Sequence, residues 1–328
     1  MVADTIRRKI PVPGVRPLDV SRDLKAVAEL IAAAFRDDMD PSGERSVREM
    51  RTAGRWAFLF GWMDRLSPPG EGMAPGFVWV EDNRVVGTLS VRRVAYGRGW
   101  LIGNVAVAPE WRRRGIARQL MMAAIDLAHQ RRGDWVALQV RSDNAGAGAL
   151  YESLGFKSIG ESILYRRTKS VQVTPPTTPI EGLRRARASE ADRIYSLAQS
   201  AIPESLRWTE PLRRDDFWMG FDRDLNNWLM GRRETWWVID SGSGLVGAVH
   251  AEAVRPPDDG RLGVWVAPGW HGQYEDALVR TALAALGDAA NRPTIAGVPA
   301  TSAAAISVLE SVGFEMLRRL THMWLELR

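Results

Sequence analysis

The chain has 328 residues, of which 45% are hydrophobic, and it carries a formal net charge of +5 at pH 7. This length is sufficient for two domains with ordinary hydrophobic cores. The sequence contains no cysteine, which excludes disulfides, thiolate metal sites and a covalent acyl-cysteine intermediate. Its four histidines show no metal-ligand spacing, so we expect no bound metal.

The excess of basic residues is the one feature of the composition that suggests nucleic acid. However, the 44 lysines and arginines are spread along the chain beside 39 acidic residues, which is typical of a solvated surface. We therefore expect no nucleic-acid partner. Arg7, Arg8 and Lys9 are not followed by an apolar run, and no segment approaches membrane-spanning length. These features predict a cytoplasmic protein without a membrane partner. The sequence does not decide between a monomer and a homodimer.

The first elements in chain order are a helix and a hairpin. Apolar residues recur at helical spacing over residues 24–31. Residues 77–87 contain two apolar runs that are separated by the turn-forming sequence Glu81-Asp82-Asn83-Arg84. This pattern is typical of a β-hairpin.

The stretch from 104 to 117 is the most informative in the chain, because it places a strand, a turn and a helix start in succession. Apolar residues recur at helical spacing from Ile116 to Leu127. A helix N-terminus offers backbone N–H groups without an intrahelical partner, together with the positive end of the helix dipole. Gly115 and Ala117 keep side chains from blocking an approaching phosphate. The stretch therefore predicts a site that holds a diphosphate.

Two linked motifs carry a resemblance to a known family. The turn reads Arg112-x-x-Gly115-x-Ala117, which is similar to the motif A loop of the GCN5-related N-acetyltransferases (GNAT). An apolar strand at 135–140 is then followed, at the spacing of the family's motif B, by Asn144, Ala147, Leu150, Tyr151, Gly155 and Phe156. The resemblance implies an α/β fold, of the α+β mixed-sheet kind, in each of two tandem copies. Each copy would have a mixed, mostly antiparallel sheet flanked by helices, with strands four and five splayed apart.

The resemblance also implies an activity, that of an acetyl-CoA-dependent N-acetyltransferase. The acetyl group would pass directly to a primary amine of a small molecule or peptide. In this family the pantetheine arm of acetyl-CoA pairs with strand four, and the turn amides hold the diphosphate. The implied cofactor-binding residues are Val105, Ala106, Val107, Arg112, Arg113, Arg114, Gly115, Ile116, Ala117, Arg118, Asn144, Ala147 and Tyr151. The alternative hypothesis is a non-catalytic acyl-CoA-binding sensor or partner-binding module.

Three of these assignments leave alternatives open. Tyr151 resembles the family's catalytic general acid, which protonates the departing thiolate, but its spacing also allows packing against Phe156. The arginines at 112–114 could contact phosphates or form a solvated basic turn. Asn144 could bind pantetheine, cap the helix that begins near Ala145, or do both.

The sequence does not identify the general base. Gln139 lies where the ribosomal-protein alanine acetyltransferases of the family carry a glutamate, and an amide cannot act as that base. This departure argues against a simple transfer of the ribosomal-protein activity. The other candidates are turn carboxylates, which we expect to be solvated, and carboxylates in the family's substrate-binding region: Glu81, Asp82 and Glu110 in the first group, and Asp37, Asp38, Asp40 and Glu44 in the second.

The chain repeats one plan twice. The hairpin at 77–87 returns at 236–247, and two short sequences return in the same order, as Val107-Ala108-Pro109 and Val266-Ala267-Pro268, and as Gly155-Phe156 and Gly313-Phe314. A proline-rich stretch at 170–179 cannot continue a helix or a central strand. We therefore predict a catalytic domain at 1–169, a linker at 170–179 and a second domain at 180–328.

The second copy differs from the first where acetyl-CoA is expected to bind. Alignment on Val-Ala-Pro places Tyr274 opposite Gly115 and Asp276 opposite Ala117, where a carboxylate would repel a diphosphate. Alignment on Gly-Phe removes the general acid as well, because it places Ser302 opposite Asn144 and Leu309 opposite Tyr151. We therefore predict that the second domain is degenerate and binds no CoA.

Substrate selectivity in this family depends on the segment between strands one and two, here about residues 35–76. The segment contains the aromatic run Arg55–Met63, which could line a pocket or belong to a core or an interdomain seam. The matching part of the second copy is equally aromatic, with Trp208, Phe217, Trp218, Phe221 and Trp228. The sequence does not select one acceptor amine.

Overall fold

The computed structural model describes residues 14–35, 47–48, 50, 76–94, 98–168, 173–210 and 212–327. The chain forms two compact units that interleave along the sequence. The first unit comprises Met1–Gln139, Gly146–Ser158 and Met323–Arg328, and the second comprises Val140–Ala145 and Ile159–His322.

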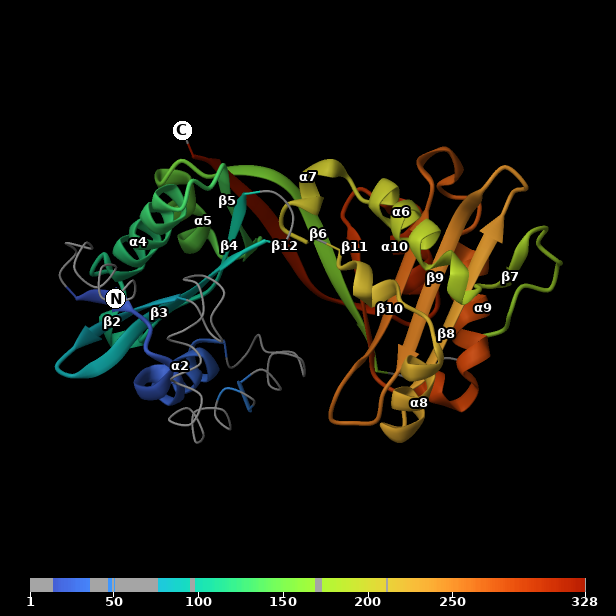
Figure 1. Ribbon diagram of the computed structural model, residues 1–328, viewed down its shortest axis with the longest axis horizontal. Coiled ribbons are helices and arrows are strands. Elements are labelled where there is room, and N and C mark those ends of the chain that lie inside the picture. Colours follow the sequence, from blue (N-terminus) through green and yellow to red (C-terminus); the bar gives the residue numbers. More distant parts are fainter. Residues whose placement is uncertain are drawn as a thin grey trace. The chain divides into compact units, whose positions relative to one another are not determined.

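The sheet of the first unit starts with antiparallel strands. Strands β1 to β4 are neighbours in chain order, and β5 lies parallel to β4 on its other side. Helices α2, α4 and α5 accompany these strands (Figure 1), together with the 3-10 helix η1. The bounds are β1 Val15–Pro17, α2 Val20–Ala34, β2 Gly76–Glu81, β3 Arg84–Arg93, β4 Gly99–Val107, η1 Pro109–Trp111, α4 Ile116–Gln130, β5 Trp135–Arg141 and α5 Ala145–Ser153.

Helices α2 and α4 cover opposite faces of this sheet. Val78 of β2 packs against Val27 of α2 in one hydrophobic cluster. Trp79 points to the other face, because successive strand residues alternate. On that face a Cβ placed on Gly87 would lie 3.3 Å from Trp79 and 2.8 Å from Ile116 of α4. Gly87 therefore lets the start of α4 pack closely on β3.

The predicted local elements of the first copy are confirmed. Strands β2 and β3 form the expected hairpin, and its turn residues Asp82 and Asn83 both have positive φ, at 46° and 59°. The apolar stripe that begins at Ile116 lies on α4, where Leu120 and Ala124 are fully buried. The mixed sheet with flanking helices agrees with the predicted fold class.

The second unit has the same plan, and its sheet includes a strand from the first copy of the repeat. The strand order is β6-β11-β10-β9-β8-β7. Strand β6 precedes the proline-rich stretch in sequence, and it pairs antiparallel with β11 from Ser162↔Pro299 to Arg167↔Thr294. The bounds are β6 Lys157–Arg167, β7 Leu183–Arg185, η2 Ala188–Glu190, α6 Ala191–Ala201, α7 Glu204–Arg207, η3 Arg214–Phe217, α8 Phe221–Leu229, β8 Arg233–Asp240, β9 Leu245–Ala253, β10 Gly260–Val266, η4 Pro268–Trp270, α9 Glu275–Leu286, η5 Gly287–Asn291, β11 Thr294–Pro299, α10 Ala303–Ser311 and β12 Glu315–Glu326.

The end of the chain belongs to the first unit. The backbone N–H of Leu327, one residue after β12, donates to the carbonyl oxygen of Asp134 at 2.8 Å. The last strand of the second copy therefore ends in the first unit, whereas most of the last strand of the first copy lies in the second unit. Each unit thus contains strand residues from the other copy, and experiments on either unit need the full chain.

Matching turns accompany the matching elements. Strands β8 and β9 form the second predicted hairpin. Gly155 and Gly313, which follow the last helix of their copies, have nearly the same φ, 91° and 89°. The repeat read from the sequence is therefore a structural repeat.

The second unit contains a fully buried histidine, His322. The side chain of His322 is 0% exposed, and its Nε2 lies 2.7 Å from the Ser162 hydroxyl, while its Nδ1 contacts the Thr209 hydroxyl. Burial lowers the pKa of His322 from 6.5 to about 4. The imidazole therefore stays neutral in the folded protein at pH values where the unfolded chain already binds a proton.

We expect the folding stability to fall as the pH decreases from 6.5 to 4, because only the unfolded chain takes up a proton on His322 over that interval. The loss from this one group is about 3 kcal/mol at the acidic end. Urea unfolding at pH 7 and at pH 4.5 measures it for the wild type and for His322→Gln. The variant should lose less stability between the two pH values than the wild type, and equal losses would contradict the assignment.

Candidate active site

Strand β4 contains a bulge within the predicted cofactor-binding strand. Thr88 pairs with Ala106 and Ser90 pairs with Gly103, so β4 places one more residue than β3 between these two pairs. Asn104 in the bulge has a φ of 52°, and its side-chain amide donates to the Ser90 hydroxyl at 3.3 Å. A bulge bends the strand that carries it. The end of β4 is therefore redirected relative to its beginning.

The ladder between β4 and β5 ends before the strands do. Their parallel pairing stops at Ile102↔Leu138, whereas β4 continues to Val107. This is the predicted splaying of strands four and five. On the side away from β3, the residues of β4 beyond Ile102 therefore have no ladder partner on β5.

Backbone alternation directs the N–H of Val107 away from β3, to the side where the β5 ladder has ended. The next N–H, that of Ala108, donates to the Val86 carbonyl oxygen at 2.9 Å, on the β3 side. Adjacent residues of a strand direct their N–H groups to opposite edges, so Val107 donates away from β3. Its carbonyl oxygen accepts from Nε of Arg112 at 3.1 Å. The end of β4 thus offers a backbone donor to a ligand chain.

The turn after β4 is held by its own arginines. The Arg112 contact with Val107 fixes the start of the turn to the strand. The guanidinium of Arg114 lies 4.5 Å from the Trp111 ring and donates to the Glu110 carbonyl oxygen at 3.1 Å. These contacts give Arg112 and Arg114 a structural role within the turn, and contact of either side chain with a phosphate stays a prediction. Arg113 is exposed and has a φ of 61°.

Helix α4 begins at a glycine that has open space beside it. Gly115 is its N-cap, with a φ of 80°, and a Cβ placed on it would meet nothing within 4 Å. The first helical hydrogen bond runs from the N–H of Gln119 to the Gly115 carbonyl oxygen. The N–H groups of Ile116, Ala117 and Arg118 therefore have no earlier carbonyl within the helix. These donors, the helix dipole and the open space fit a diphosphate.

Tyr151 is buried at the end of α5. It is 5% exposed, and its ring centroid lies 6.1 Å from that of Phe156. Burial raises the pKa of Tyr151 to about 12, so the side chain stays a protonated phenol at neutral pH. The packing role that the spacing allows is therefore present, and the phenol also keeps the proton that a general acid needs.

The other predicted site residues lie near the two ends of α5. Arg118 donates to the Ser153 hydroxyl at 3.0 Å, which joins α4 to α5. Ala147 is half-buried on α5. Asn144 precedes the first residue of α5 directly, as its capping reading requires, and it is exposed and grouped with the second unit. Gln139 is exposed on β5.

Several sequence candidates lie outside the described residues. They include the acidic residues Asp37, Asp38, Asp40 and Glu44 and the aromatic run Arg55–Met63. In the second copy, Phe217 is buried in the cluster under α6, whereas Trp218 and Trp228 are exposed. The aromatic residues of that copy are thus divided between the core and the surface.

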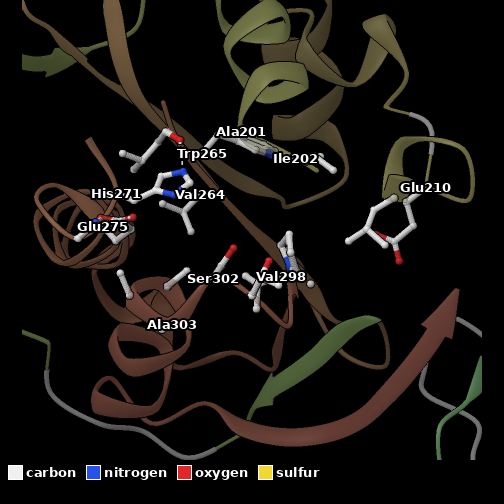
Figure 2. Close-up of a pocket in the computed structure, with 18 residues that line it drawn as sticks. Ala201, Ile202, Glu210, Val264, Trp265, His271, Glu275, Val298, Ser302 and Ala303 are labelled. Atoms are coloured by element: carbon white, nitrogen blue, oxygen red, sulfur yellow. Dashed lines mark hydrogen bonds between the residues drawn. The ribbon is translucent and has the colours of Figure 1, made fainter. Parts of the chain in front are cut away.

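The second unit contains a cleft at the position that matches the end of the β4–β5 ladder. The ladder between β10 and β11 stops at Leu262↔Ala296, and β10 continues to Val266. A cavity of about 280 Å³ lies there, lined by strand residues and by His271, Gly272 and Glu275 at the start of α9 (Figure 2). The pairing of β9 with β10 is regular over its whole length, so β10 lacks the bulge of β4.

The residues expected to block this cleft have other roles. The Tyr274 ring stacks on Trp270 at 5.5 Å, and the Asp276 carboxylate pairs with Arg280 at 2.7 Å. The carboxylate that contacts the turn amides is that of Glu275, which accepts from the N–H of Gly272 at 2.9 and 3.1 Å. Glu275 was not predicted from the sequence. Its signal is a carboxylate at the first residue of a helix, three residues after a glycine turn.

The early end of the β4–β5 ladder and the glycine-capped start of α4 are the features on which the family resemblance depends. The profile of the acetyltransferase (GNAT) family matches residues 32–156. A ribosomal protein bS18-alanine N-acetyltransferase of Escherichia coli is 32% identical over 100 residues, which cover 30% of this chain and 67% of that protein. The chain therefore belongs to the GNAT family, and it is an enzyme of the acyltransferase type.

Other relatives extend the likeness. A mycothiol acetyltransferase of Kocuria rhizophila is 30% identical over 156 residues, which cover 46% of this chain and 48% of that protein. A GCN5-related N-acetyltransferase from Sphaerobacter thermophilus has a TM-score of 0.65 at 17% identity, with 96% of both chains covered. A tandem GNAT protein from the clavulanic acid biosynthesis pathway has a TM-score of 0.61, with 95% of this chain and 98% of that one covered. These structures support the tandem fold.

The part of the chain that the structure describes contains neither a candidate membrane span nor a candidate metal site. No helix there has the length and apolar character needed to cross a membrane. No group of three or more histidine, aspartate or glutamate side chains there has an arrangement that could hold a metal ion.

Proposed function

We propose that this protein is an acetyl-CoA-dependent N-acetyltransferase whose first unit binds acetyl-CoA. The acetyl group passes directly from the thioester to a primary amine of a small molecule or peptide. The observation that carries the proposal is the set of free backbone donors around Gly115, next to the open edge of β4. The interleaved second unit is proposed to bind no CoA.

The backbone of the first unit does most of the binding. The edge of β4 pairs with the amides of pantetheine as a neighbouring strand would. The N–H of Val107 points away from β3 and donates to the thioester oxygen as negative charge develops there. Loss of one such donor costs about 3 kcal/mol in comparable enzymes. Because this donor is main chain, no side-chain substitution removes it.

The proton balance assigns a role to Tyr151. A C–N bond forms between the amine and the acetyl carbon, and the C–S bond breaks. The departing thiolate takes its proton from the phenol of Tyr151. The amine proton passes to a water molecule or a carboxylate, because the amide of Gln139 cannot accept it.

Two relatives guide the choice of acceptor. One is named for an alanine of a ribosomal protein and the other for mycothiol, and their matches cover 30% and 46% of this chain. The glutamine at position 139 argues against simple transfer of the first activity. A panel of acceptors therefore includes both a peptide with an N-terminal alanine and small-molecule amines.

Release of free thiol from acetyl-CoA across this panel tests the proposal. At least one amine should raise thiol release well above the rate without amine, and mass spectrometry should find the acetyl group on nitrogen. Binding of acetyl-CoA without release for any amine would contradict catalysis and favour the sensor hypothesis.

A further inference from the structure

Glu275 occupies the anion-binding position of the second unit. Glu275 is the first residue of α9, and it is 6% exposed. One carboxylate oxygen accepts from the N–H of Gly272 at 2.9 Å and from that of Tyr274 at 3.3 Å, and the other accepts from Gly272 at 3.1 Å. Figure 2 shows this carboxylate at one end of the cleft, beside His271. The protein thus supplies an anion to its own turn.

The corresponding turn in the first unit has no such carboxylate. Arg112 and His271 occupy matching positions, because each side chain contacts the carbonyl oxygen of the last residue of the preceding strand. Arg112 Nε lies 3.1 Å from the Val107 oxygen, and His271 Nε2 lies 2.9 Å from the Val266 oxygen. Counted from these strand ends, the residue that matches Glu275 is Ile116. The Ile116 side chain is buried and has no oxygen that could accept a hydrogen bond from the amides beside Gly115.

The rest of the second cleft is open. The cavity of about 280 Å³ runs along the end of β10 and reaches Val298 of β11. The N–H of Ala267 donates to the Val246 carbonyl oxygen at 2.9 Å, so by alternation Val266 directs its N–H into the cleft. In the same way, Val107 directs its N–H away from β3. The strand edge that would receive a ligand chain is therefore retained, whereas the anion end is filled.

We propose that Glu275 is a built-in counter-anion that closes the second cleft to phosphate and diphosphate groups. A diphosphate would have to displace this carboxylate from two backbone donors or lie beside a like charge. The cleft then accepts only ligands whose group at that end is uncharged or cationic. This inference concerns the second unit alone and does not require that the first unit binds acetyl-CoA.

Glu275→Ala in the full chain, probed with inorganic pyrophosphate, tests the proposal. The readout is amide hydrogen exchange of residues 268–280, which reports on this turn and not on the turn around Gly115. In the wild type these amides should be protected equally with and without pyrophosphate. In Glu275→Ala, exchange at Gly272 and Tyr274 should accelerate by at least about tenfold, and pyrophosphate should restore protection.

The neighbouring carboxylate supplies a matched control. Asp276→Ala removes a charge one residue away, from a side chain that is 56% exposed and paired with Arg280, and it should behave as the wild type does. Glu275→Gln keeps the side-chain length and removes only the charge, so it provides a second variant if the alanine variant does not fold. Protection of the wild-type turn amides by pyrophosphate would overturn the proposal. So would a result in which pyrophosphate protects these amides in neither Glu275 variant.

Discussion

Gly115→Val should weaken acetyl-CoA binding by about 100-fold, which corresponds to about 2.7 kcal/mol. Gly115 has a φ of 80°, which β-branched residues rarely adopt, so valine would move the backbone donors at the start of α4. A Cβ at this position meets no protein atom within 4 Å. The fold therefore has room for the valine side chain, and the main effect should be a loss of affinity for acetyl-CoA. Calorimetric titration of acetyl-CoA into the full chain measures the change.

Gly272→Val is the matched control for the first prediction. Gly272 has a φ of 85° and a Cβ there also meets nothing within 4 Å, so the backbone strain is comparable. It lies in the turn of the second unit, where we expect no CoA. The two variants should lose similar amounts of thermal stability, whereas only Gly115→Val should lose affinity. Equal effects of the two substitutions on affinity would refute the assignment of the diphosphate to the first turn.

Tyr151→Phe should lower turnover by about 10²- to 10⁴-fold while acetyl-CoA affinity stays within about twofold. Phenylalanine keeps the ring that packs on Phe156 and removes only the hydroxyl. Because burial raises the pKa of Tyr151 to about 12, its ionisation should not limit activity until the pH approaches that value. Steady-state thiol release, with the best amine of the panel, measures turnover as a function of pH.

Tyr165→Phe controls for the loss of a buried phenol. Tyr165 is 2% exposed, donates to Glu310 at 2.9 Å, and also has a pKa raised to about 12, first by burial. Its removal should affect stability without a comparable effect on turnover. If Tyr151→Phe leaves turnover unchanged, the hydroxyl is not the acid and the residue serves packing alone.

Local patterns predicted the elements around the site because such patterns are set by neighbouring residues. The stripe on α4 reflects one buried helix face, and the turn at Asp82 and Asn83 reflects backbone conformations that these residues tolerate. The splaying of strands four and five came from the family resemblance. It could not come from alternation, because alternation specifies a face and not a partner strand.

Strand pairing across the repeat was not visible in the sequence. The alternation within β6 does not indicate whether its neighbour comes from its own copy, and the prolines after it suggested a boundary there. The pairing of β6 with β11 and the return of Leu327 to Asp134 depend on tertiary contacts. The two compact units of this protein are therefore not two consecutive segments of the chain.

Side-chain direction explains why Glu275 was not predicted from the sequence. Alignment identified Tyr274 and Asp276, because they replace small residues of the motif. It did not identify Glu275, because the matching Ile116 reads as a core residue. The carboxylate reaches the turn amides only because the first residue of α9 directs its side chain back toward the preceding turn.

A crystal structure of the full chain with acetyl-CoA is the sharpest test of which unit holds the cofactor. We expect the diphosphate on the amides of Ile116, Ala117 and Arg118, with pantetheine along the end of β4 and no ligand at Glu275. A ligand in the cleft between β10 and β11, with the turn at Gly115 unliganded, would show that the assignment of the two units is wrong.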